Sequence, residues 1–135
     1  MEKLARILLV DDDDTTNFLN ELLLKKLDVT DHVQVALSGR QALELLTQEP
    51  PYAPSLLLLD VKMPGMDGME FLEAYHALPA EQQRVTKIVM LTTSMDSGDL
   101  SRLEQLPVAG LVSKPLTRDK IADLLQLHFQ RYLPA

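Results

Sequence analysis

The sequence contains no cysteine among its 135 residues. Disulfides, thiolate catalysis and cysteine-ligated metal sites are therefore excluded. It also has no apolar run long enough to span a bilayer, and its first six residues lack the long apolar segment and small-residue cleavage site of a signal peptide. From these absences we expect a cytoplasmic protein that does not associate with membranes.

Basic residues are fewer than acidic residues in this sequence. Thirteen Lys and Arg stand against 20 Asp and Glu, which gives a formal net charge of −7 at pH 7. A negative surface repels the phosphate backbone, so non-specific binding to nucleic acid or to an anionic membrane is disfavoured. Cations and basic protein surfaces remain suitable partners.

No Pro-, Gly- or Ser-rich linker, internal repeat or low-complexity tract divides the chain. Its length suits one domain with a proper core. We therefore expect residues 1–135 to form a single domain, with no output domain attached.

Short apolar segments alternate along the chain with segments of helical periodicity. The pattern predicts strands at 6–10, 33–37, 56–59, 87–91 and 108–112, and helices at 15–27, 38–48, 68–78, 98–106 and 117–132. Right-handed crossovers then require a parallel sheet with helices on both faces. The length is typical of an α/β, flavodoxin-like doubly wound (βα)5 fold with strand order 2-1-3-4-5. In the first helix, the apolar residues at helical spacing are Phe18, Leu19, Leu22, Leu23 and Leu27, which we expect to face the core.

Asp60 directly follows the four leucines of the third predicted strand and precedes a tight turn at Pro64 and Gly65. In open α/β sheets the working site lies outside the carboxyl ends of the strands. In the order 2-1-3-4-5, four of these ends adjoin one another. The residues found there are Asp11, Asp12, Asp60, Thr92 and Lys114.

Crowded carboxylates repel one another unless they are protonated or bridged by a cation. These stretches contain no Cys or His, so an all-oxygen ligand set favours Mg²⁺ or Mn²⁺. The hydroxyl of Thr92 and the ammonium of Lys114 make the site complementary to a phosphoryl group. Asp60 is then the candidate nucleophile that forms an aspartyl phosphate.

Over essentially its full length the chain resembles the receiver domains of two-component response regulators, the chemotaxis-regulator-like superfamily. The matching motifs are Asp11-Asp12 after Ile-Leu-Leu-Val, Asp60 before Met-Pro-Gly-Met-Asp-Gly, Thr92 after Val-Met-Leu, and Lys114-Pro115 after Gly-Leu-Val-Ser. The resemblance implies a stand-alone response regulator. Such a protein is a phosphoacceptor in signal transduction and not an enzyme, beyond promoting its own phosphorylation and dephosphorylation.

The resemblance also implies a metal site. Mg²⁺ would be held by the carboxylates of Asp12 and Asp60 and the backbone carbonyl of Lys62, with Asp11 acting mostly through water. Asp60 would accept a phosphoryl group from a phosphohistidine of a sensor kinase or a histidine phosphotransfer protein.

Further roles implied by the resemblance concern the phosphoryl oxygens. Lys114 would contact them, and Thr92 would reorient to hydrogen-bond them. The Lys114-Pro115 peptide bond is expected to be cis. The change would be read at the face made by the fourth helix, fifth strand and fifth helix, through which the protein would act on an unknown effector, either as a monomer or as a weak dimer.

Three positions depart from the family pattern. Leu111 occupies the position, three residues before the lysine, at which family members often have an aromatic residue that swings inward when the threonine moves. Thr93 is larger than the Ala or Gly usual after Thr92, and Lys62 brings a long cation to the rim of the site. We expect altered hydrolysis of the acyl phosphate, of either sign.

Two alternatives are open at this point. Asp11-x-Asp13-x-Thr15 after a strand also resembles the nucleophile motif of haloacid-dehalogenase-like phosphatases, although no cap domain is evident and Asp60 is then unexplained. A pseudo-receiver that binds partners without phosphorylation is the other alternative, which Leu111 allows. For Asp13 and Asp14 themselves we expect a solvated helix start.

Overall fold

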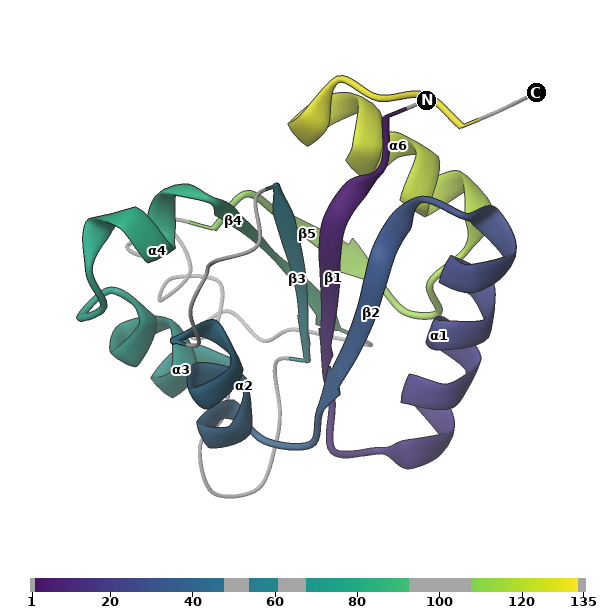
Figure 1. Ribbon diagram of the computed structural model, residues 1–135. Helices are drawn as coiled ribbons and strands as arrows, with labels where there is room; N and C mark the ends of the chain where they lie inside the picture. The colour runs from purple at the N-terminus through teal and green to yellow at the C-terminus, as the bar shows by residue number, and fades with distance from the viewer. Residues whose placement is uncertain (1, 48–53, 61–67, 93–107, 134–135) are drawn as a thin grey trace.

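The protein is a parallel α/β sheet covered by helices on both sides (Figure 1). The computed structural model describes residues 2–47, 54–60, 68–92 and 108–133, to which all structural statements here refer. Its strands are β1 (Leu4–Val10), β2 (Thr30–Ala36), β3 (Ser55–Asp60), β4 (Thr86–Thr92) and β5 (Gly110–Ser113). All neighbouring strands are parallel, in the order β2-β1-β3-β4-β5, so the predicted fold class and strand order are confirmed.

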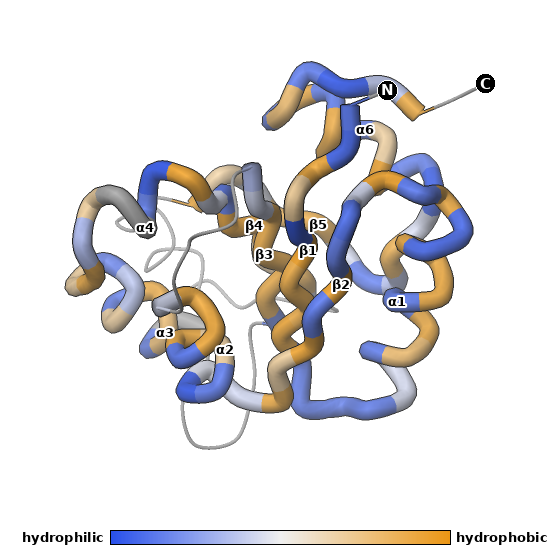
Figure 2. Tube along the Cα trace, viewed as in Figure 1, coloured by the Kyte–Doolittle hydropathy of each residue, from blue (hydrophilic) through white to orange (hydrophobic). Residues whose placement is uncertain are grey.

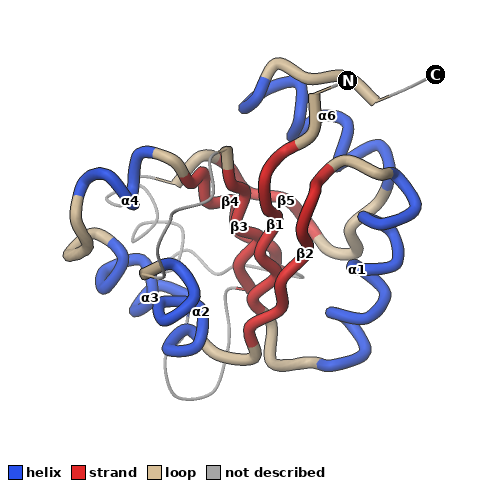
Figure 3. Tube along the Cα trace, in the orientation of Figure 1, coloured by secondary structure: helices blue, strands red, loops and turns tan. Residues whose placement is uncertain are grey.

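The described helices divide between the two faces (Figures 1 and 3). They are α1 (Asp14–Leu27), α2 (Gly39–Leu46), α3 (Gly68–Tyr75), α4 (Ala80–Arg84) and α6 (Arg118–Phe129). In the figures α1 and α6 lie on one side of the sheet, and α2, α3 and α4 lie on the other. No helix in these ranges is long and apolar enough to cross a membrane.

One predicted helix needs correction, and another falls outside the described residues. The segment 68–78 was expected to be one helix, but α3 ends at Tyr75 and Pro79 then precedes the separate short helix α4. Proline is favourable at a helix start and unfavourable inside one, so it separates the two. The helix expected at 98–106 falls outside the described residues.

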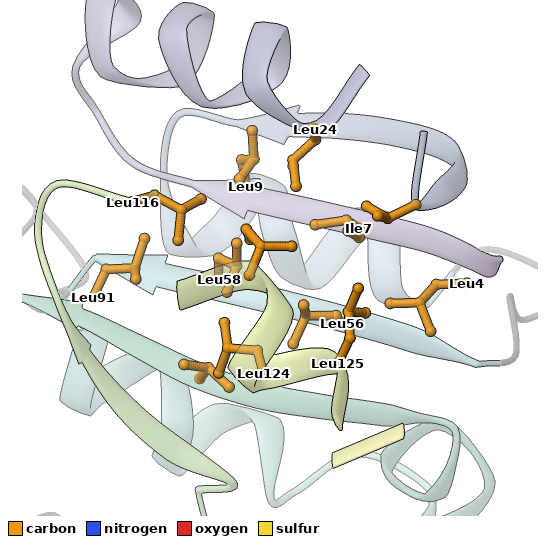
Figure 4. Close-up of a cluster of buried hydrophobic side chains, with 13 residues drawn as sticks. Leu4, Ile7, Leu9, Leu24, Leu56, Leu58, Leu91, Leu116, Leu124 and Leu125 are labelled. Atoms are coloured by element: carbon orange, nitrogen blue, oxygen red, sulfur yellow. The ribbon is translucent and has the colours of Figure 1, made fainter. Parts of the chain in front are cut away.

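Each central strand is buried on both faces and supplies two cores. In β1, Leu8 and Val10 join the core under α2 and α3, whereas Ile7 and Leu9 join the core under α1 and α6. Figure 4 shows the second of these cores, and in Figure 2 the central strands β3 and β4 are mostly orange, the colour of hydrophobic residues. The leucines of β3 are at most 1% exposed, as an unbroken apolar strand in a parallel sheet requires.

Helix α1 presents a different face to the sheet than predicted. Phe18, Leu19 and Leu22 are 60%, 57% and 50% exposed, so their assignment to the core was wrong. Asn17 and Leu24, two turns apart, are buried in their place. The Asn17 side chain donates to the backbone carbonyl of Asp11 at 2.8 Å, and this polar contact fixes the rotation of the helix.

Candidate functional site

The sheet register aligns the carboxyl ends of four strands. Val10 pairs with Leu59, Asp60 with Leu91, and Thr92 with Ser113. The residues at or just after these strand ends therefore lie along one edge of the sheet. β1 and β3 are adjacent there although β2 lies between them in sequence, and such a change of direction in strand order is where ligands bind in doubly wound sheets.

Three carboxylates converge at this edge. Asp11, Asp12 and Asp60 each offer an oxygen, and these oxygens all lie within 4.8 Å of one another. Asp11 and Asp60 are buried, with 5% and 9% of their surface exposed, whereas Asp12 is exposed. Oxygen-only donors at this spacing suit a hard divalent cation that keeps part of its water shell, so the side chains fit the expected Mg²⁺.

Lys114 joins the acid cluster from the loop after β5. Its Nζ lies 3.0 Å from Asp11 Oδ2 and 3.2 Å from Asp60 Oδ1. Burial by itself lowers the pKa of this ammonium, but the hydrogen bond to Asp11 and the charges of Asp60 and Asp11 outweigh burial and raise the pKa above its ordinary value. Lys114 is therefore charged at neutral pH. Its backbone N–H donates to the Thr92 carbonyl at 2.8 Å, and the Lys114-Pro115 peptide bond is cis.

The start of α1 holds Asp11 and Asp13 in place. One Asp11 carboxylate oxygen accepts from the Asp13 N–H at 2.9 Å, while Asn17 holds the Asp11 carbonyl. Asp13 is the N-cap of α1, as expected for a helix start. Hydrogen bonds from the Thr16 hydroxyl and the Thr15 backbone N–H keep the pKa of Asp13 below its ordinary value.

The remaining predicted residues differ in what the structure says of them. Thr92 ends β4, half-buried, beside the end of β5. Leu111 lies on β5 and is 45% exposed. Lys62 and Thr93 lie outside the described residues.

Sequence reasoning missed Asn17 and Lys120, which support Asp11 and the loop carrying Lys114. The sequence around Asn17 gives no signal for its burial, because Asp14, Asn20 and Glu21 lie at helical spacing from it. Lys120 is a cation in a first helical turn, where the helix dipole disfavours it.

The electrostatics of the cluster define what it can bind. Three carboxylates and one ammonium leave a net charge of −2 in a half-buried site. A divalent cation neutralises this charge, and the ammonium is then available for an anion held beside Asp60. This is the composition of a site for phosphoryl transfer to a carboxylate.

Comparison with known proteins agrees with this class of site. The family model of the response regulator receiver domain matches residues 7–126, and the chain belongs to this family. A probable chemotaxis protein CheY from Rhizobium etli is 28% identical over 92% of both chains. The crystal structure of a response regulator receiver protein from Dyadobacter fermentans superposes with a TM-score of 0.82 at 29% identity, covering 92% of this chain and 97% of the other.

A longer relative shares the same module. The signal transduction histidine-protein kinase BarA of Escherichia coli is 33% identical over 91% of this chain, but the match spans only 13% of the kinase. Receiver domains in general bind Mg²⁺ and interact with histidine kinases and effectors in two-component signalling.

Proposed function

We propose that this protein is a response regulator whose Asp60 accepts a phosphoryl group from a phosphohistidine of a sensor kinase or a histidine phosphotransfer protein. A carboxylate oxygen of Asp60 forms the new O–P bond as the N–P bond breaks. The imidazole of the donor keeps the bonding electron pair and takes up a proton. The product is an aspartyl phosphate, and the donor histidine is regenerated.

The observation that carries this proposal is the contact of one ammonium with two buried carboxylates. Lys114 Nζ lies against Asp60, so a phosphoryl group on Asp60 gains a cation beside its oxygens. A Mg²⁺ ion bound at the cluster of Asp11, Asp12 and Asp60 would supply the remaining charge neutralisation. Thr92, at the end of the adjacent strand, would supply a hydroxyl to the phosphoryl oxygens.

The decisive experiment is small-molecule phosphorylation. With acetyl phosphate and Mg²⁺, intact-mass spectrometry is expected to show one added phosphoryl group that hydroxylamine removes. Asp60→Asn is expected to abolish the label, whereas Glu44→Gln, which neutralises an exposed acid on α2, is expected to leave it unchanged.

Other outcomes would overturn the proposal. Absence of label in the folded wild type, with no Mg²⁺-dependent rise in melting temperature, would favour the pseudo-receiver. Rapid turnover of phosphate esters that is lost in Asp11→Asn would favour the phosphatase mechanism.

The donor protein needs a surface beside Lys114, and α1 offers one. A groove of about 330 Å³ lies between α1 and the loop after β5, and its lining includes Leu19, Leu23, Lys114, Pro115 and Leu116. We assign this groove and the adjoining exposed Phe18 to the phosphohistidine-bearing partner, because a protein seated there lies next to the ammonium that contacts Asp60. The buried apolar area would supply the affinity.

This assignment has its own test. Leu19→Asp is expected to slow phosphotransfer from a phosphorylated donor protein at least tenfold while leaving labelling by acetyl phosphate unchanged, because the small donor needs no docking surface. Leu127→Asp, on the exposed side of α6, is the matched control. Equal loss with both donors would instead show damage to the site.

Output requires a second interaction. We propose that phosphorylation is read by an effector protein, or that the phosphoryl group is passed on in a relay. The added charge of nearly −2 sits beside Thr92 and Lys114, whose backbones are joined by a hydrogen bond, so a shift of either residue is carried to the end of β5.

A further inference from the structure

Lys120 occupies the first turn of α6, a position that electrostatics disfavours for a cation. The N-cap of this helix is Thr117, whose side chain accepts from the Lys120 backbone N–H at 3.3 Å. The partial positive charge of a helix N-terminus repels a lysine there. A cation that breaks this local rule and also makes specific contacts is informative, because such departures concentrate at functional or strained sites.

The compensating contacts of Lys120 lie on the loop that carries Lys114. Its ammonium donates to the Ser113 carbonyl at 2.7 Å and lies 3.3 Å from the Ser113 hydroxyl oxygen. It also donates to the Pro115 carbonyl at 2.8 Å. One cation therefore joins the residue before Lys114 to the residue after it.

Three sets of contacts hold Lys114 in place. Lys120 bridges its two neighbours, its own N–H bonds to the Thr92 carbonyl at 2.8 Å, and its ammonium reaches Asp11 and Asp60. A flexible lysine side chain loses rotamer entropy when it is fixed between two carboxylates. A rigid backbone at the base of the side chain reduces the volume that the ammonium can explore.

We propose that Lys120 is a positioning residue for Lys114. By joining Ser113 to Pro115 it holds the loop so that the Lys114 ammonium stays beside Asp60, where the phosphoryl group is to be received. This inference rests on the proposed function of Asp60. Lys120 itself touches neither the carboxylates nor the phosphoryl group in this role.

The test compares two cations of the same helical turn. Lys120→Met keeps most of the length of the side chain and removes the charge, and it is expected to slow labelling by acetyl phosphate about tenfold, as displacement of a positioned group does. Arg118→Met removes a cation from the exposed start of the same helix and is expected to leave the rate within twofold. Equal rates for Lys120→Met and wild type would overturn the proposal.

A double-mutant cycle separates positioning from general structural damage. In a Lys114→Met background, Lys120→Met is expected to change the labelling rate by less than twofold, because no ammonium is left to position. Full additivity of the two losses would overturn the proposal. Lys120→Gln, which keeps an N–H donor, is expected to retain an intermediate rate and serves as the second variant if Lys120→Met does not fold.

Failure of the proposed function can be told apart from failure of this inference. If wild type is not labelled on Asp60, the proposed function fails, and the positioning role is judged from crystal structures of the two helix variants. The Lys114 ammonium is expected to leave Asp11 and Asp60 in Lys120→Met and to keep both contacts in Arg118→Met. An unmoved ammonium in Lys120→Met overturns the inference whatever the labelling shows.

Discussion

The two ends of the sheet treat buried charge in opposite ways. At the carboxyl end, Asp11 and Asp60 are buried close to the carboxylate of Asp12, and Lys114 contacts the two buried acids. At the amino end, Arg6 is 3% exposed, and its Nε and one terminal nitrogen both donate to the Ser55 hydroxyl at 3.0 Å. One end gathers three acids around one lysine, and at the other end a buried cation donates to the neutral side-chain oxygens of Ser55 and Gln34.

The difference separates stability from function. Like charges brought together cost free energy of folding, and a protein retains them where a ligand is to be bound. Buried groups whose hydrogen bonds are satisfied stabilise the fold and bind nothing. Substitutions at the amino end are therefore expected to change stability alone, whereas substitutions at the carboxyl end change ligand binding and affect stability in the opposite direction.

The largest effect on stability is expected at the amino end. Arg6→Met should lower the free energy of unfolding by about 3 kcal/mol, because the buried Ser55 hydroxyl loses its donors. Urea unfolding measures this loss, and Arg40→Met, on the exposed side of α2, is the control. Labelling of the folded fraction by acetyl phosphate should not change, and a selective loss of labelling would break the contrast between the two ends.

A pH effect of intermediate size is expected from Tyr75, also at the amino end. Burial raises the pKa of Tyr75 to about 12, against smaller opposing effects of Thr86 and Arg6. A folded-state pKa above the unfolded value stabilises the fold fully below pH of about 10, and this contribution is lost as pH rises toward 12. The free energy of unfolding should fall by about 2 kcal/mol across this range.

The check for Tyr75 is a comparison of two variants. Tyr75→Phe should remove the alkaline loss of stability and the late tyrosinate absorbance, whereas Tyr132→Phe, at an exposed position, should preserve both. A Tyr75 that ionises at the same pH as free tyrosine would contradict the assignment of the amino end as a closed, stabilising region.

The smallest effect is expected at the carboxyl end, and its sign is opposite. Without Mg²⁺, Asp60→Asn should raise the free energy of unfolding by about 1 kcal/mol, because the repulsion of Asp60 by Asp11 and Asp12 outweighs its attraction to Lys114. The Mg²⁺-dependent rise in melting temperature should shrink in the same variant. Destabilisation by Asp60→Asn in metal-free buffer would show that repulsion among the three carboxylates does not destabilise the fold.

Strands β1, β3 and β4 could be read from the sequence because each contains a short apolar run that ends at polar residues. The same property placed Asp11, Asp60 and Thr92 at strand ends. The rotation of α1 could not be read, because leucines occur on several sides of this helix and the apolar pattern does not select one. The buried hydrogen bond of Asn17, a tertiary contact, selects it.

Helix α4 and Lys120 were missed for a related reason. A five-residue helix is too short to show periodicity. Arg118 and Lys120 are both cations in the first turn of α6, and only the positions of the acceptors single out Lys120.

The sequence by itself determined which chemical groups end the strands, since apolar runs and their terminal acids are local properties of the chain. Only the tertiary structure decided which charges meet. Lys114 lies 103 residues from Asp11 and 54 from Asp60, yet its ammonium bonds to both. Because electrostatic energy depends on distance and burial, the charge balance of the site exists only once parallel pairing has brought these strand ends together.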